Sequence, residues 1–139
     1  MNDDLPEIDP NEAEKRRQGD SRTVIIDVRS QVEYEFVGHP IGAVHIPWKE
    51  FPNWEENTDF CMAVDSALSR ERSDDILSTP LLMLCRSGAR SLAAGKKLAE
   101  HGYTDVTNIA EGFEGDKDKS NHRSNLNGWR YHGLPWEQS

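Results

Sequence analysis

The chain has 139 residues, of which 35% are hydrophobic, and a formal net charge of −9 from 16 Lys and Arg against 25 Asp and Glu. This length fits one domain, the acidic balance argues against nucleic acid or an anionic membrane as a partner, and no apolar run approaches the ~18 residues of a membrane span. Cys61 and Cys85 are the two cysteines, and the acidic N-terminus resembles no targeting signal, so we expect a cytoplasmic protein without a disulfide framework.

The polar residues 1–7 are expected to form a flexible N-terminus ahead of a single domain at residues 8–139. A helix should begin directly after this segment. Asp9 is placed to cap it and Pro10 to occupy its first position, because a proline there loses no hydrogen bond. Gly19 marks its expected end.

Alternating strand and helix patterns fill the rest of the chain up to residue 109. We expect strands at 23–28, 43–46, 81–84 and 106–109, and helices from residue 59 to before residue 73 and at 91–101. Strands that alternate with helices pair in parallel and connect by right-handed crossovers. The sequence therefore predicts an α/β domain with a mostly parallel central sheet and helices on both of its faces.

The chain carries one chemically distinctive loop, Cys85-Arg86-Ser87-Gly88-Ala89-Arg90, between an apolar strand and an amphipathic helix. Free backbone N–H groups and the helix dipole make such a loop a site for anions. Gly88 allows the chain to curl, and Arg86 and Arg90 add two permanent cations. We therefore expect Cys85 to favour the thiolate form and to act as a nucleophile. The alternative is a buried cysteine that serves as a small hydrophobic residue.

The loop resembles that of rhodanese-type sulfurtransferases. Four residues separate Cys85 from Arg90. Cysteine phosphatases have a similar anion-binding loop, but with five residues between cysteine and arginine. The resemblance covers about residues 8 to 136 and rests also on the segments 26–29, 33–34, 38–47, 108–112 and 128–136. One departure lies at Gly38-His39-Pro40-Ile41-Gly42, where the commoner order in the family is Gly-His-Ile-Pro-Gly.

The resemblance implies a three-layer rhodanese-like domain in which Cys85 carries sulfane sulfur as a persulfide. Thiosulfate or a related anion would be the donor, and cyanide or a thiol the acceptor. The loop residues Arg86, Ser87, Gly88, Ala89 and Arg90 would bind the substrate and the persulfide. No metal or organic cofactor is expected.

Two further residues are expected at the rim of this loop, because ligands bind beyond the carboxyl ends of parallel strands. Asp27 would brace the loop through hydrogen bonds, as the resemblance also implies, or take part directly. Arg29 would form a rim salt bridge or contact the substrate.

Other functions stay open at this point. The chain could be a persulfide carrier loaded by a partner protein, a non-catalytic interaction module, or a phosphatase or arsenate reductase on the same scaffold. The polar residues 115–127 form either a solvated loop or a lid or docking surface.

Several other side chains invite a functional role, but packing or turn roles are favoured for all of them. His39 and His45 are candidates for a general base or a metal site, and Cys61 is a candidate for a resolving cysteine. Trp48 is a candidate for the wall of the active-site mouth. The remaining ones are Trp129 and Trp136, expected to pin the C-terminal segment, and Glu111 and Gly112, expected in a turn.

Overall fold

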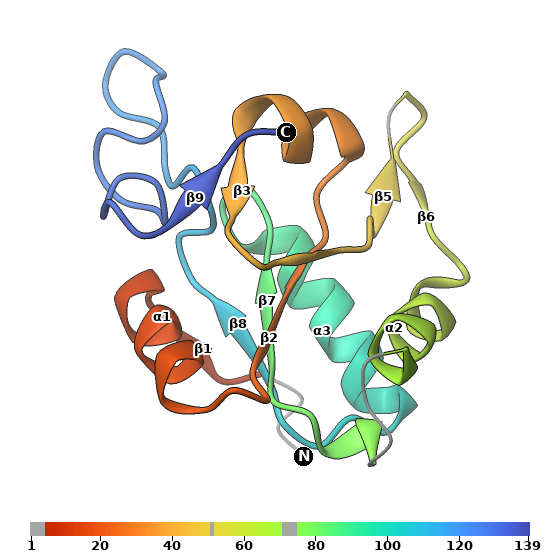
Figure 1. Ribbon diagram of the computed structural model, residues 1–139. Coiled ribbons are helices and arrows are strands. Elements are labelled where there is room, and N and C mark those ends of the chain that lie inside the picture. Colours follow the sequence, from red (N-terminus) through yellow and green to blue (C-terminus); the bar gives the residue numbers. More distant parts are fainter. Residues whose placement is uncertain (1–4, 51, 71–74) are drawn as a thin grey trace.

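The computed structural model describes residues 5–50, 52–70 and 75–139 and is built on a parallel five-stranded sheet. The strand order is β1 (Glu7–Ile8), β8 (Val106–Ile109), β7 (Leu81–Leu84), β2 (Val24–Asp27) and β4 (Val44–His45). Helix α1 (Pro10–Gly19) covers one face, and α2 (Phe60–Ser69) and α3 (Ala89–His101) cover the other (Figure 1). The expected three-layer α/β fold with a mostly parallel sheet is confirmed.

Smaller elements gather at the carboxyl end of this sheet (Figure 1). A short π-helix, η1 (Glu33–Val37), follows β2. Strands β3 (His39–Pro40) and β9 (Trp136–Glu137) pair antiparallel, as do β5 (Lys49–Glu50) and β6 (Glu55–Glu56). At the other end lies the short 3-10 helix η2 (Ile76–Ser78). The carboxyl end is the end at which a ligand site is expected.

The sheet divides the core into two layers because successive strand residues point to opposite faces. On β7, Met83 packs with the α2 and α3 side, whereas Leu82 and Leu84 pack with Trp129 and Ala13 on the α1 side. All four residues of β7 are buried. This explains why the strand preceding Cys85 reads as a continuous apolar run.

In the N-terminal part of the chain, the predicted helix cap is confirmed, whereas Glu7 differs from expectation. Asp9 caps α1 as predicted, because its Oδ1 accepts the N–H of Glu12 at 2.8 Å. Glu7 was expected in a flexible segment but lies in β1, opposite Asn108 of β8. A two-residue strand leaves no periodic pattern, and its pairing partner lies far away in the sequence. Residues 1–4 fall outside the described residues.

The other boundaries differ from expectation by a few residues. Helix α3 begins at Ala89, two residues earlier than predicted, because Gly88 turns the chain with a φ of 120° and its carbonyl accepts the N–H of Leu92. Helix α2 ends at Ser69, and the last residues of its predicted range, 71–72, are not among those described. No helix in the described part of the chain has the length and hydrophobicity to cross a membrane.

Candidate active site

Cys85 occupies the junction between β7 and the turn into α3. Its residue surface is only 1% exposed. The backbone N–H of Gly88 donates to its Sγ at 3.1 Å. The loop therefore presents a backbone donor to the sulfur, and the surface position of Arg86 leaves a cation at its mouth.

A second contact to the sulfur comes from Ser91, which the sequence analysis did not single out. Its Oγ lies 3.3 Å from Sγ of Cys85 and 2.6 Å from Oδ1 of Asn108. Asn108 is held in this orientation because its Nδ2 donates to Oε2 of Glu7 and to the Gly88 carbonyl, both at 3.1 Å. The Gly88 carbonyl, at 3.2 Å, is a third acceptor for this hydroxyl. A hydroxyl has a single hydrogen, so Ser91 donates to one of these three groups at a time and can turn towards a thiolate.

Arg90 does not stand free beside the sulfur, although the sequence suggested it as an anion contact. Its Nη1 and Nη2 donate to the two carboxylate oxygens of Glu33 at 2.7 and 2.8 Å. Glu33 also accepts the backbone N–H and the hydroxyl of Ser30. Burial by itself raises the pKa of Glu33, but the hydrogen bonds and charge of Arg90 outweigh it and lower the pKa to about 2. The ion pair therefore persists at every physiological pH.

A cleft of about 620 Å³ opens beside the loop. Trp54, in the turn between β5 and β6, forms part of its wall, and the guanidinium of Arg90 lies 5.7 Å from the centre of the Trp54 ring. Trp48, the aromatic considered for this place, is buried and packs edge-to-face on Phe60. The cleft is lined by Ser30, Val32, Glu33, Val37, Trp54, Arg86, Arg90 and Glu114.

Asp27 and Arg29 form a completely buried ion pair at the end of β2. Nη2 of Arg29 lies 2.7 Å from Oδ2 of Asp27, and both side chains are 0% exposed. Arg29 also donates to the Gly38 carbonyl at 2.6 Å and lies 4.5 Å from the centre of the Phe113 ring. Of the two roles considered for Arg29, the structure has the salt bridge, and its side chain does not line the cleft.

Gly112 lies against the backbone of the loop that begins at Cys85. The backbone N–H of Phe113 donates to the Cys85 carbonyl at 2.8 Å, and that of Glu114 to the Arg86 carbonyl at 3.0 Å. Gly112 has a φ of +68°, and a Cβ added to it would lie 2.5 Å from the carbonyl carbon and oxygen of Arg86. The absence of a side chain is what lets the two segments approach so closely.

Gly112→Ala should therefore destabilise the fold and displace the loop. We expect the free energy of unfolding to fall by about 2–4 kcal/mol, from the unfavourable φ and the clash with backbone together. Gly133→Ala is the matched control, because Gly133 also has a positive φ, of +71°, but a Cβ there meets nothing within 4 Å. Its cost should be about 1 kcal/mol. Equal losses in urea unfolding would show that the close approach to Arg86 is not what requires the glycine.

The two histidines of the N-terminal segment are engaged in the fold. His39 is buried and stacks on Tyr34 with ring centroids 3.8 Å apart, and Nε2 of His45 lies 2.7 Å from the Arg29 carbonyl. Cys61 is half-buried on α2, and burial, followed by the nearby charge of Asp65, raises the pKa of its thiol. The described residues contain no group of three or more side chains suited to a metal ion.

The C-terminal segment is fixed by its own contacts. Trp129 is buried and its Nε1 donates to the Pro135 carbonyl, and Trp136 packs edge-to-face on Phe113. Glu111 accepts the Gly128 N–H at 2.9 Å, which ties the turn after β8 to the start of this segment.

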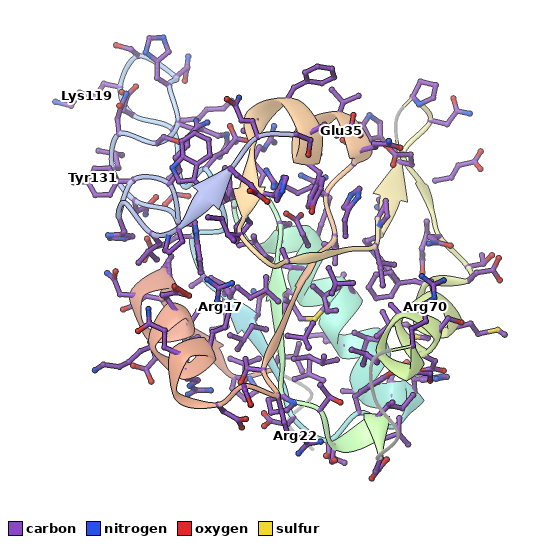
Figure 2. The ribbon with its side chains drawn as sticks, viewed as in Figure 1. Arg17, Arg22, Glu35, Arg70, Lys119 and Tyr131 are labelled. Carbon is purple, nitrogen blue, oxygen red and sulfur yellow. The ribbon has the colours of Figure 1, made fainter. Side chains whose placement is uncertain are left out.

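The polar residues 115–127 are ordered by hydrogen bonds among themselves. Asp118 accepts the backbone N–H groups of Ser120 and His122, and Asn127 accepts that of Asp116. The loop carries Lys119 away from the sheet (Figure 2). None of the side chains of residues 115–127 lines the cleft, although Glu114, which directly precedes them, does.

Comparisons with known proteins agree with this architecture. An uncharacterized protein of Rickettsia conorii is 34% identical over 116 residues, which is 81% of each chain. The thiosulfate sulfurtransferase GlpE of Haemophilus influenzae is 28% identical over 110 residues, 78% of this chain and 85% of that protein. The crystal structure of Rv0390 from M. tuberculosis superposes with a TM-score of 0.80 at 34% identity and covers 97% of this chain and 98% of its own.

The sequence model of the family described as "Rhodanese-like domain" matches residues 9–119, which is most of the chain. Relatives that carry out sulfur transfer, and a fold shared along nearly the whole length with a solved structure, agree with that match. The chain therefore belongs to the rhodanese-like domain family.

Proposed function

We propose that the protein transfers sulfane sulfur through a persulfide on Cys85, with thiosulfate as one donor. The single observation that carries the proposal is the placement of Sγ of Cys85, which ends a buried strand, accepts the Gly88 N–H at 3.1 Å and lies beneath the loop that leads into α3. A thiolate held by backbone donors is a nucleophile that needs no adjacent histidine.

The first half-reaction would load the sulfur. The Cys85 thiolate attacks the outer sulfur of thiosulfate, a new S–S bond forms, the S–S bond of the donor breaks, and sulfite leaves with the electron pair. Arg86, which is exposed at the cleft, would attract the donor and stabilise the departing sulfite. The backbone N–H groups of residues 86–90 would hold the outer sulfur of the persulfide.

The second half-reaction would return Cys85 to its thiolate. Cyanide, or a thiolate acceptor, attacks the outer sulfur of the persulfide, and Cys85 leaves with the electron pair of the broken S–S bond. With cyanide the product is thiocyanate. Neither half-reaction requires a metal ion.

Intact-mass measurement after incubation with thiosulfate tests this mechanism. The protein should gain the mass of one sulfur atom, peptide mapping should place it on Cys85, and cyanide should remove it with release of one equivalent of thiocyanate. A protein that gains no sulfur from thiosulfate or from a persulfide donor would contradict the proposed function.

A further inference from the structure

The cleft beside Cys85 balances its own charges. Two arginines and two glutamates line it, namely Arg86, Arg90, Glu33 and Glu114. The bidentate contact with Glu33 occupies the outer nitrogens of Arg90. A small dianion binds more weakly to a cleft of balanced charge than to one with an excess of positive charge, and the side chains of this cleft have no such excess.

The size and lining of the cleft also differ from what a small oxyanion needs. Its volume of about 620 Å³ lies within the ~300–1,000 Å³ of sites that hold drug-sized ligands, whereas thiosulfate has only five heavy atoms. Val32, Val37 and Trp54 give it an apolar wall.

Apolar side chains also continue outside the cleft. Val32 is 52% exposed, Trp54 42%, and Phe36, about one helical turn after Val32, is 70% exposed. Exposed apolar groups of this kind next to a recessed nucleophile are typical of a surface that docks a larger partner.

Acidic residues lie on the two elements that carry Trp54 and Phe36, the β5–β6 hairpin and η1. The β5–β6 hairpin contributes Glu50, Glu55 and Glu56, of which the latter two are exposed, against one lysine, Lys49, which stands opposite Glu56. Glu50 accepts the backbone N–H of Gln31, which joins the hairpin to the segment that leads into η1. Glu35 lies on η1 at the same end of the sheet (Figure 2). A surface with apolar groups next to an acidic rim complements a basic polypeptide.

We propose that this cleft docks a basic segment of a partner protein whose cysteine exchanges sulfur with Cys85, and that Glu33, by holding Arg90, lowers the preference of the site for small oxyanions. The proposal rests on the proposed function and names its partner. Cys85 is 1% exposed and does not itself line the cleft, whose wall includes the loop residues Arg86 and Arg90. The partner cysteine must therefore reach the loop through the cleft on an accessible stretch of chain, with apolar side chains against Val32 and Trp54 and lysines or arginines over the hairpin.

The transfer itself is a balanced exchange. The Cys85 thiolate attacks the outer sulfur of the partner persulfide, R–S–SH, so that one S–S bond forms and another breaks. The partner leaves as the thiolate R–S⁻, and Cys85 becomes Cys–S–SH with the proton carried on the transferred sulfur. The reverse exchange delivers sulfur to an acceptor cysteine, and neither direction needs an oxidant or a reductant.

Two persulfide-bearing peptides of equal length test the charge preference of the full-length protein. Each has one cysteine flanked by leucines, with lysines in one peptide and glutamates in the other. We expect kcat/KM for loading of Cys85 to be about tenfold higher with the basic peptide, and this advantage to shrink as ionic strength rises. Equal rates, or an equally fast reaction with cysteamine persulfide as a small cationic donor, would overturn the docking of a polypeptide.

Charge reversal of the rim locates the effect. Glu55→Lys combined with Glu56→Lys should remove most of the preference for the basic peptide and should not lower kcat/KM for thiosulfate. Glu100→Lys is the matched control, because Glu100 lies 73% exposed near the far end of α3 and should leave the peptide preference unchanged. An unaltered preference in the double variant, or an equal loss in the control, would contradict a docking surface at the hairpin.

The role of Glu33 is tested with thiosulfate. Glu33→Gln should raise kcat/KM for thiosulfate severalfold, because Arg90 gains an unopposed charge, and should lower it for the basic peptide. Glu114→Gln removes a cleft charge that belongs to no ion pair in the described part of the chain, so it should act in the same direction, more weakly, without loss of fold. No rise in either variant would overturn this role. A wild-type protein that no donor loads would instead contradict the proposed function itself.

Discussion

Cys85→Ser should abolish sulfur transfer while the protein stays folded. The serine hydroxyl can accept the Gly88 N–H and face Ser91 as the sulfur does, so the loop keeps its hydrogen bonds. An alcohol is scarcely ionised at neutral pH and cannot carry sulfane sulfur as a persulfide. We expect thiocyanate formation to fall at least about 10⁴-fold, as for loss of the nucleophile in other covalent enzymes.

Cys61→Ser is the matched control for this prediction. Cys61 is the other cysteine of the chain and lies on α2, where its Sγ faces the Lys97 carbonyl at 3.8 Å. Turnover and the sulfur adduct should both persist in this variant. Residual turnover in Cys85→Ser, or loss of the adduct in Cys61→Ser, would move the nucleophile away from Cys85. Unchanged melting temperatures would show that the comparison is between folded proteins.

The sequence was sufficient for the parts of this site that depend on neighbouring residues. The apolar run 81–84, the glycine of the loop and the following helix pattern are local signals, and the structure has β7, a positive φ at Gly88 and α3 in their places. The parallel sheet with helices on both faces followed from the same alternation of elements. Local patterns specify these features because each element buries one continuous apolar stretch.

The partners of the loop could not be predicted in this way, since they come from distant parts of the chain. Glu33 lies 57 residues before Arg90, and Asn108 lies 17 residues after Ser91. Glu33 belongs to one of the segments that resemble the rhodanese family, yet nothing in its sequence neighbours indicates that its carboxylate neutralises Arg90. A charged residue read from sequence has a known charge but an unknown partner, and here the partner decides whether the arginine is available to an anion.

Asp27→Asn should produce the largest loss of stability among the site-supporting residues. The substitution keeps the shape of the side chain but leaves the Arg29 guanidinium, which is 0% exposed, without its counter-charge. Breaking one side of a buried ion pair costs about 3–5 kcal/mol. Ser30 and Glu33 follow Asp27 by three and six residues in the chain, so the Glu33–Arg90 contact and the wall of the cleft should loosen as well. Urea unfolding and the rate with thiosulfate measure the two effects.

Two controls separate the buried charge from a general effect of losing a carboxylate. Glu12→Gln removes the exposed ion pair with Arg16, in which the side chains are 43% and 45% exposed, and should cost at most about 1 kcal/mol. Asp27→Leu combined with Arg29→Met removes both buried charges and should be more stable than Asp27→Asn, because no unpaired charge remains. A loss below about 1 kcal/mol in Asp27→Asn, or a double variant that is less stable still, would show that the pair holds the strand end by packing and hydrogen bonds to Gly38 and not by charge.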